Sequence, residues 1–525
     1  MADLMRPLLP QTDQESVLNE DPMPLISNNK FWSLDDIIED NIGDFGWAQL
    51  VQCLLVSLAR LFDGQQTFIT IFTDAEPSWH CSTTTSFNDV TCTTNSDICQ
   101  LSNSEWAWDG SSSRTIVSEW NLQCASSIIT SLPSSSFFLG SFLGCLFLAI
   151  LADTSLGRKK LLFLSCLIMS FSALATIFST NVLIYTILKF LSGFGRASIG
   201  TCVLLLLTEK VGKKWRGQLG IMGFFFFSLG YLSLPAIAYM NRDSSWRSLY
   251  LYTSIPSIIY CIFVFIFVSE SPRWLFLQGR VSEAIEILKR IAPTKDRDLK
   301  SSLISHVDIK VEPSNSIKCL FVKRWALRRI LGVIVLGFGI GMVYYGIPMG
   351  VQDLGFNIYL GTMCNALLEM PSYLVTFFVI DRCQRRFSIL GFYIASGIFS
   401  IICFIVSSYG SNDQEIVIIK IGIEIASLFG ACMAYNIFLI YTTELFPTSV
   451  RNAATSMVRL AIAFSSVVSP VLARAGRRNA ILSYGVFGFV IIFCSIFVAF
   501  LPETKDATLC DTMTEQEKEN DMFVT

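Results

Sequence analysis

Ionisable side chains interrupt several long apolar stretches of this 525-residue chain. Arg60 and Asp63 lie three residues apart, which places them on one face of a helix, while Glu369 and Arg459 stand in later apolar stretches. Charges within a membrane span are costly, so each one indicates either a function or an ion pair. Side chains of these types could bind a charged solute or exchange a proton.

Each of these charges has two interpretations. Arg60 and Asp63 could neutralise each other. Alternatively, Asp63 could face a central cavity together with Gln65 and Gln66 and take up a proton there. Glu369 could bind a cation, or it could form an ion pair with Arg459.

Two further pairs of charges follow helical spacing. Lys189 and Arg196 are seven residues apart and are expected to share a face of their helix. Lys420 and Glu424 are four apart and could neutralise each other. Tyr231 is a weaker candidate for holding an organic cation by cation–π attraction, because most aromatic side chains in such a chain pack or contact lipid.

The elements that position these charges are membrane helices. The chain is 52% hydrophobic and 15% charged, whereas about a quarter of the residues of a soluble domain are charged. This composition excludes a soluble enzyme, and the net charge of −3 argues against a nucleic-acid partner. The segment TEKVGKKW (208–215) lacks the glycines and the hydroxyl residue of a phosphate-binding loop. No nucleotide, metal or other cofactor is expected.

Twelve apolar stretches are long enough to cross a bilayer, six in each half of the chain. They span residues 48–72, 129–152, 161–180, 182–207, 219–240, 249–269, 328–350, 357–380, 388–408, 415–441, 453–473 and 480–500. The expected organisation is a tail, a six-helix bundle with an outer loop at 73–128, a linker, a second bundle and a tail. Their bounds are 1–46, 47–269, 270–327, 328–500 and 501–525. Lys and Arg are more frequent in the loops on one side, so both tails and the linker are predicted to be cytoplasmic.

A charged motif follows the second helix of each half. DTSLGRKK contains Asp153 and Arg158, and DRCQRRF contains Asp381, Arg382 and Arg385. The aspartate could accept hydrogen bonds from a nearby helix N-terminus, and the arginine could pair with acids of the same half. Such contacts would lock one face of a transporter. Six helices per half with this loop are typical of the major facilitator fold, an all-α architecture.

The segments that flank the first helix carry other signals. Cys81, Cys92, Cys99 and Cys124 lie in the outer loop and could form two disulfides of unknown connectivity. The tail segment DPMPLI (21–26) resembles an acidic dileucine sorting signal. Together with the lack of N-glycosylation sites, it favours the vacuolar membrane over the plasma membrane.

Several motifs resemble known transporters. ESPRWLFLQGR, with Glu270 and Arg273, LPETK (501–505), and TELFPTSVRN, with Glu444 and Arg451, resemble the sugar and organic-ion branches of the major facilitator superfamily. PSWHC and TIVSEWNLQC are similar to hallmarks of the organic cation, anion and carnitine transporters. FDGQQTFITIFTDAEP and SGFGRASIGTC look like the plant members. The resemblance covers about residues 47–505.

The resemblance implies a substrate site at mid-membrane between two bundles that rock against each other. Tyr344 and Tyr345 match a tyrosine pair that lines the cavity in the family, and Glu369 matches an acidic position. Ala463 stands where animal relatives have a charged residue, whereas Arg459 lies one turn earlier. Cation selectivity therefore cannot be transferred from that position.

The sequence thus predicts a secondary active transporter of small organic cations or zwitterions, carnitine-like or polyamine-like, with a coupling proton or sodium ion undecided. A carrier of organic anions or sugars is the alternative, and a non-transporting sensor is a remote one. The residues expected to bind substrate are Asp63, Gln66, Tyr344, Tyr345, Glu369, Tyr435 and Arg459. Those expected to gate are Asp153, Arg158, Glu270, Arg273, Asp381, Arg382, Arg385, Glu444 and Arg451.

Overall fold

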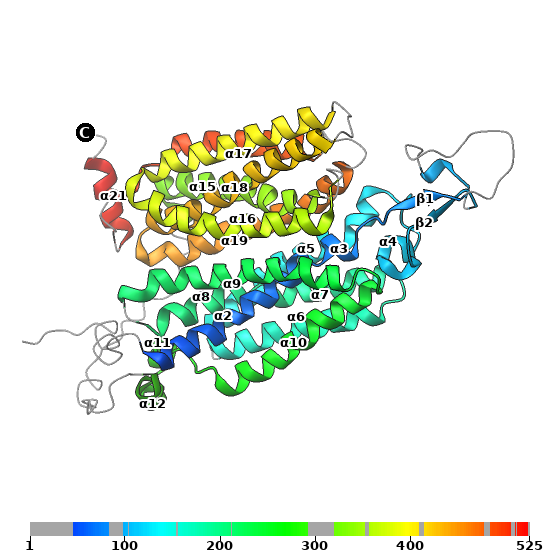
Figure 1. Ribbon diagram of the computed structural model, residues 1–525. Coiled ribbons are helices and arrows are strands. Elements are labelled where there is room, and N and C mark those ends of the chain that lie inside the picture. Colours follow the sequence, from blue (N-terminus) through cyan, green and yellow to red (C-terminus); the bar gives the residue numbers. More distant parts are fainter. Residues whose placement is uncertain are drawn as a thin grey trace, which may run out of the picture.

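The computed structural model is almost entirely helical (Figure 1). It describes residues 46–82, 98–102, 104–153, 156–211, 213–291, 320–351, 356–408, 414–476, 483–505, 510 and 512–522. The DPMPLI segment and Cys92 lie outside the described residues. The side chains of Asp153 and Asp381 lie outside the description as well.

Two helical bundles lie side by side (Figure 1). The first contains α2 (Trp47–Phe68), α5 (Ser127–Asp153), α6 (Arg158–Ala175), α7 (Val182–Arg196) with α8 (Ile199–Glu209), α9 (Lys213–Met240) and α10 (Trp246–Phe267). The second contains α15 (Arg324–Met349), α16 (Ile358–Arg382), α17 (Arg385–Ser408), α18 (Gln414–Leu445), α19 (Thr448–Gly476) and α20 (Tyr484–Ser495) with η6 (Ile496–Phe500). The predicted all-α fold of two six-helix bundles is confirmed.

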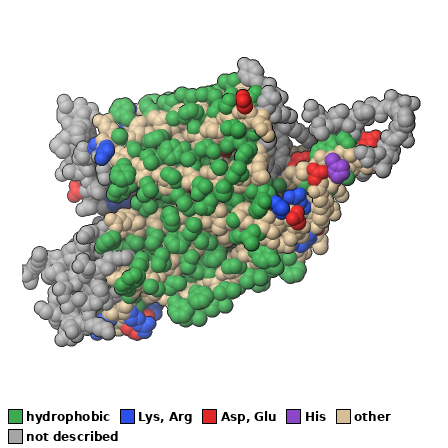
Figure 2. Space-filling model, viewed as in Figure 1, with side chains coloured by type: hydrophobic (Ala, Val, Ile, Leu, Met, Phe, Trp, Pro, Cys, Tyr) green, Lys and Arg blue, Asp and Glu red, His purple; other side chains and the backbone are tan. Residues whose placement is uncertain are grey.

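Ten helices in the described part of the chain are long and apolar enough to cross a membrane. The two remaining members of the predicted twelve are α2, whose apolar stretch carries Arg60, Asp63 and several glutamines, and the shorter apolar segment Tyr484–Phe500. Hydrophobic side chains cover most of the face visible in Figure 2, and the visible charged ones gather toward its two ends. Large apolar side chains such as Phe147 and Phe265 are exposed on this surface. This pattern is that of a multi-pass membrane protein, whose outer face contacts lipid.

The small elements define the two ends of the molecule. One, called here the hairpin end, carries α3 (Thr70–Thr73), β1 (Trp79–Cys81), η1 (Ile98–Gln100), β2 (Trp106–Trp108), η2 (Ser112–Arg114) and α4 (Ile116–Glu119). Strands β1 and β2 are antiparallel, with Trp79 opposite Trp108. A disulfide joins Cys99 to Cys124, and Cys81 is disulfide-bonded too.

The opposite end, called here the linker end, carries α11 (Pro272–Leu277), α12 (Val281–Ile291) and α21 (Met513–Met522) (Figure 1). The apolar stripe predicted for α12 is present, because Ala284 and Leu288 are buried against Trp274 and Phe276 of α11. The helix therefore caps this end of the first bundle.

Glycines bring the helices of the first bundle unusually close. A Cβ atom at Gly193 of α7 would stand 1.8 Å from the carbonyl oxygen of Phe137 in α5, and one at Gly230 of α9 would stand 2.0 Å from that of Leu61 in α2. Only glycine allows such an approach. Between the bundles, α5 packs on α19 and α9 packs on α16. These contacts place the charged residues of α2 and α7 beside the second bundle.

Candidate functional site

A cavity of about 120 Å³ lies between the two bundles, near the middle of the helices. Helices α2, α5, α7, α8 and α9 line it from the first bundle, and α15, α18 and α19 line it from the second. A volume of roughly 10–15 Å³ of this kind holds one water molecule, so the cavity has room for several. Its charged lining residues are Arg60, Asp63, Arg196 and Arg459.

Asp63 is the acidic centre of this cavity and is fully buried. Arg60 Nη1 donates to its Oδ2 atom at 2.5 Å, so the predicted ion pair is formed. Arg196 Nε, from α7, donates to the other carboxylate oxygen at 2.6 Å. The two guanidinium groups more than neutralise the single carboxylate.

Arg459 faces the cavity from the second bundle. Its Nη1 atom donates to Thr201 Oγ1 of α8 at 2.5 Å, which links the two bundles. The predicted ion pair between Glu369 and Arg459 is therefore wrong, because Glu369 is bonded to tyrosines of its own bundle. With three arginines against one carboxylate, the cavity lining carries a net positive charge.

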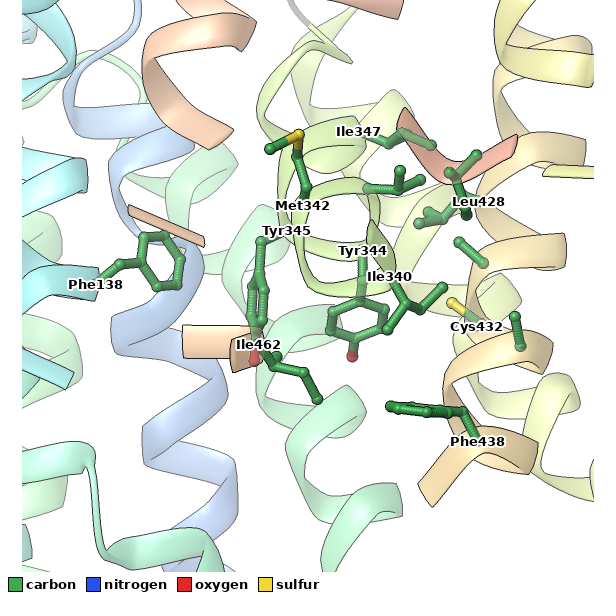
Figure 3. Packing of buried hydrophobic residues seen from close by; sticks show 14 of the residues in the cluster. Phe138, Ile340, Met342, Tyr344, Tyr345, Ile347, Leu428, Cys432, Phe438 and Ile462 are labelled. Carbon is green, nitrogen blue, oxygen red and sulfur yellow. The ribbon is translucent and has the colours of Figure 1, made fainter. Parts of the chain in front are cut away.

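Tyrosines form the wall of the cavity on the side of the second bundle. Tyr345 and Tyr435 line it, and Tyr344 stacks on Tyr435 with ring centroids 4.8 Å apart. Figure 3 shows Tyr344 and Tyr345 pointing the same way from α15, with Phe138 of the first bundle on the far side of Tyr345. The centroids of Phe138 and Tyr345 are 5.0 Å apart. These rings offer several faces to a cation.

Glu369 lies behind this wall and not on the cavity surface. It is buried, and its Oε1 atom accepts hydrogen bonds from the hydroxyls of Tyr344 and Tyr373, the latter at 3.0 Å. The Tyr373 hydroxyl lies 3.0 Å from Ser228 Oγ of the first bundle. No cation lies within 4 Å of the carboxylate among the described residues, so its negative charge is held by neutral donors alone.

Glu424 is a second buried acid in the same bundle. It accepts a hydrogen bond of 3.0 Å from Asn365 Nδ2 of α16. The predicted ion pair with Lys420 is not formed. One turn of helix separates the two side chains, but the carboxylate points at α16 instead of along its own helix.

Other predicted residues lie away from the cavity. Gln66 donates to Thr253 Oγ1 of α10 at 3.2 Å, and Gln65 donates to Ser233 Oγ of α9 at 2.8 Å, so neither lines it. Tyr231 packs on Phe68. Residues between adjacent positions of α2 thus face three different neighbours, which follows from the rotation of about 100° per residue in a helix.

The sequence interpretation missed several lining residues. Arg196 was expected only to share a face with Lys189. It does so, since both cations lie over the ring of Phe137. Thr201 and Ser141 were not singled out. The available signal was the segment SGFGRASIG (192–200), whose small residues surround the break between α7 and α8.

The charged motifs at the linker end form two equivalent caps. Glu270 accepts hydrogen bonds from the backbone N–H groups of Arg158 and Lys159, at 3.1 and 3.0 Å, at the N-terminus of α6. Glu503 accepts those of Arg385 and Arg386, at 2.8 and 3.1 Å, at the N-terminus of α17. A carboxylate at a helix N-terminus satisfies free N–H groups and the helix dipole.

A second carboxylate supports each cap. Glu444 lies 3.3 Å from Arg385 Nε, and Thr504 Oγ1 donates to it at 2.7 Å. In the first bundle, Glu209 acts electrostatically on Arg158. Glu503 and Glu209 were not among the predicted residues, although LPETK contains the first and the repeated Thr-Glu of TEK and TEL marks the second.

The remaining predicted gating residues lie nearby. Arg382 is exposed, and its carbonyl oxygen accepts a hydrogen bond from Lys505. Arg451 Nε donates to the carbonyl oxygen of Phe446, and Arg273 lies in the first turn of α11. Every contact described at these caps joins helices of one bundle, so the caps hold each bundle together and do not join the two.

Comparison with known proteins identifies the family. The model of the "Sugar (and other) transporter" family matches residues 82–515. Organic cation/carnitine transporter 3 of Arabidopsis thaliana is 50% identical over 98% of both chains, and transporter 2 of that plant is 49% identical over 92% of this chain and 94% of its own. The human organic cation/carnitine transporter 2 is 29% identical over 76% of this chain and 71% of its own.

The fold has relatives among solved structures. A partially occluded, inward-open structure of the xylose transporter XylE from E. coli matches with a TM-score of 0.63 and 16% identity, covering 88% of this chain and 100% of that one. At this identity the likeness speaks for the fold alone. The sequence matches go further: the chain belongs to the plant type of the organic cation/carnitine transporter family, within the major facilitator superfamily.

Proposed function

We propose that the protein carries small organic cations or zwitterions, carnitine-like or polyamine-like, across a membrane as a secondary active transporter. The names of its plant relatives support this class of substrate. The observation that carries the proposal is the tyrosine wall with Glu369 behind it, a buried carboxylate that has no cationic partner among the described residues. No catalytic reaction is proposed.

The tyrosine wall is suited to an ammonium group. Each ring face could contribute roughly 0.5–2 kcal/mol, and more when water is excluded. Tyr344 lies between the cavity and Glu369, so a turn of its side chain would expose the carboxylate to the bound cation. The bundles would then rock about the enclosed site, as in other two-bundle transporters.

Arg459 favours zwitterions over simple cations. Its guanidinium lines the cavity and is bonded only to a neutral hydroxyl among the described residues, so it could bind a substrate carboxylate. The same observation supports the second candidate function, a carrier of organic anions. A zwitterion would use Arg459 and the tyrosine wall together.

Coupling to a proton and location in the vacuolar membrane complete the proposal. The coupling group of the central cavity would be Asp63, whose carboxylate loses its charge on protonation. The DPMPLI segment supports the location. Changing Leu25 and Ile26 to alanine should move a fluorescent fusion to the plasma membrane in plant cells, and an unchanged distribution would remove this segment from the proposal.

Uptake into vesicles tests the transport function. The purified protein is reconstituted, and the entry of labelled carnitine, a labelled polyamine and a labelled sugar is measured against protein-free vesicles. We expect uptake of carnitine or the polyamine and none of the sugar. Uptake of the sugar with neither organic cation would overturn the proposal.

A further inference from the structure

A second group of buried charges lies at the hairpin end of the first bundle. Its charged members are Asp74, directly after α3, and Lys189 of α7, and both are fully buried. Tyr185 of α7 and Tyr250 of α10 complete it. None of these four residues lines the central cavity, so substrate binding does not account for them.

Asp74 has one satisfied and one unsatisfied carboxylate oxygen. Its Oδ1 atom accepts hydrogen bonds from Thr73 Oγ1 at 2.8 Å and from the Tyr185 hydroxyl at 2.9 Å. Its Oδ2 atom is buried without a hydrogen-bond partner among the described residues. Burying an unbonded charged oxygen is costly, and a proton on Oδ2 would remove both the charge and the cost.

Lys189 is a buried cation without a paired anion. Its Nζ atom lies 3.4 Å from the carbonyl oxygen of Gln66 and stands over the rings of Phe137 and Tyr250, at 4.5 and 5.5 Å. No carboxylate comes within 4 Å of it in the described part of the chain. Its charge therefore acts on Asp74 from a distance and opposes protonation of that carboxylate.

The other bundle also acts on Asp74. Arg474, in the last turn of α19, interacts electrostatically with it across the boundary between the bundles. An ionised Asp74 attracts this cation and favours closure of the hairpin end, where Phe72 of the first bundle stacks on Tyr359 of the second. A protonated Asp74 no longer attracts Arg474, so the closed arrangement is weakened.

The group has a connection toward each side. Thr73 lines a separate cavity of about 390 Å³ at the hairpin end. The Tyr185 and Tyr250 hydroxyls are 2.7 Å apart and extend the hydrogen-bonded group into the bundle. The carbonyl oxygen nearest Lys189 belongs to Gln66, one turn from Asp63 and the central cavity.

We propose that Asp74 binds the coupling proton at the hairpin end, with Lys189 setting how readily that proton is released. The loaded site holds a carboxylic acid at Asp74 and an ammonium at Lys189. Release of one proton leaves the carboxylate and the same ammonium. The coupling function rests on the proposed transport activity, whereas proton binding by Asp74 does not.

Infrared spectroscopy tests proton binding without a substrate. A pH titration of the purified full chain should show the carbonyl band of a buried carboxylic acid, and this band should be missing in Asp74→Asn. Asp243→Asn, which changes an exposed aspartate at the same end, is the matched control and should keep the band. An unchanged band in folded Asp74→Asn would overturn the proposal.

Vesicle transport of labelled carnitine tests the coupling. One pH unit corresponds to about 1.4 kcal/mol, so one-for-one coupling should support about tenfold accumulation in the wild type. Asp74→Asn should lose this accumulation but keep exchange of internal for external carnitine at equal pH, which also shows that it is folded. Accumulation at the wild-type level in this variant would contradict the coupling role.

Two variants that keep the carboxyl group provide an independent check. Lys189→Gln removes an opposing positive charge, and Tyr185→Phe removes a donor to the carboxylate. Both should shift the midpoint of the infrared titration to higher pH, because each change favours the protonated acid. Midpoints equal to the wild type would overturn the proposal. Absence of carnitine transport in the wild type would refute the transport function alone.

Discussion

The two bundles bury acids in different ways. In the first, Asp63 is held by the guanidinium groups of Arg60 and Arg196, at 2.5 and 2.6 Å. In the second, Glu369 and Glu424 are held by tyrosine hydroxyls and an asparagine, without a cation within 4 Å among the described residues. The linker-end caps of the same bundles are nearly identical, so the difference is confined to the membrane interior.

The difference separates structural charges from available ones. An acid that already has two cationic partners gains little from a third, whereas an acid held by neutral donors still attracts a cation in a low-dielectric surrounding. The first bundle thus uses its charges to hold α2 and α7 together, while the second keeps negative charge in reserve behind the tyrosine wall. Removing charge should therefore have opposite consequences in the two bundles.

The largest effect is expected for Asp63→Asn in the first bundle. This change leaves two buried guanidinium groups without a counter-charge, and breaking a buried pair in this way costs about 3–5 kcal/mol. We expect a lower unfolding temperature of the purified protein in detergent, together with loss of carnitine uptake.

A double variant provides the control. Asp63→Asn combined with Arg196→Gln removes one of the uncompensated charges and should recover part of the lost thermal stability. If the single variant unfolds at the wild-type temperature, the first bundle does not depend on this charge cluster and the contrast between the bundles fails.

A smaller effect on stability, but a clear one on transport, is expected for Glu369→Gln in the second bundle. Glutamine keeps an oxygen for the tyrosine hydroxyls, so folding should be nearly unchanged. An interaction with a charged group contributes about 1.5–3 kcal/mol, so the KM for carnitine should rise roughly tenfold to a hundredfold. Uptake of labelled carnitine over a range of concentrations measures this.

Glu424→Gln is the matched control, because Glu424 is also buried but is bonded to Asn365 and not to the tyrosine wall. It should leave the KM close to that of the wild type. Equal KM values for Glu369→Gln and the wild type would show that the negative charge in the second bundle is not used for the substrate.

The smallest effect is expected for a pair outside both bundles. His80 Nδ1 and Asp109 Oδ1 lie 2.5 Å apart in the exposed hairpin, and the hydrogen bond with His80, followed by one from Ser78, lowers the pKa of Asp109. Because the pKa is lowered on folding, this contribution is present above the ordinary carboxyl pKa and is lost as pH falls through the lowered value.

Hydrogen exchange of the β1 amides measures this contribution. Asp109→Asn should exchange slightly faster than the wild type at neutral pH, and the two should become equal in strong acid. The change should be small, since exposed pairs are screened by water and salt. Identical exchange at neutral pH would contradict it.

Much of the architecture could be predicted from the sequence because it depends on local patterns. Apolar stretches of membrane length and the repeated DTSLGRKK and DRCQRRF motifs were sufficient for two bundles of six helices. The pair of Arg60 and Asp63 was predictable for the same reason, since three residues of helix bring the two side chains together.

The cavity could be predicted only in part, because it depends on which helix faces which. Arg196 is 133 residues from Asp63, and no local spacing indicates that they meet. Glu369 and Arg459 looked complementary in the sequence, but the first faces tyrosines of α15 and α16 while the second reaches α8 across the boundary. Pairing depends on helix rotation and neighbours, which composition does not specify.

The two linker-end caps have a consequence for biosynthesis. Glu270 follows the sixth helix of its bundle by a few residues and caps the third, 112 residues earlier in the chain, and Glu503 does the same over 118 residues. Neither cap can close until the sixth helix of its bundle has left the ribosome. Each bundle therefore carries its own completion signal, and the first can be finished while the second is still being translated.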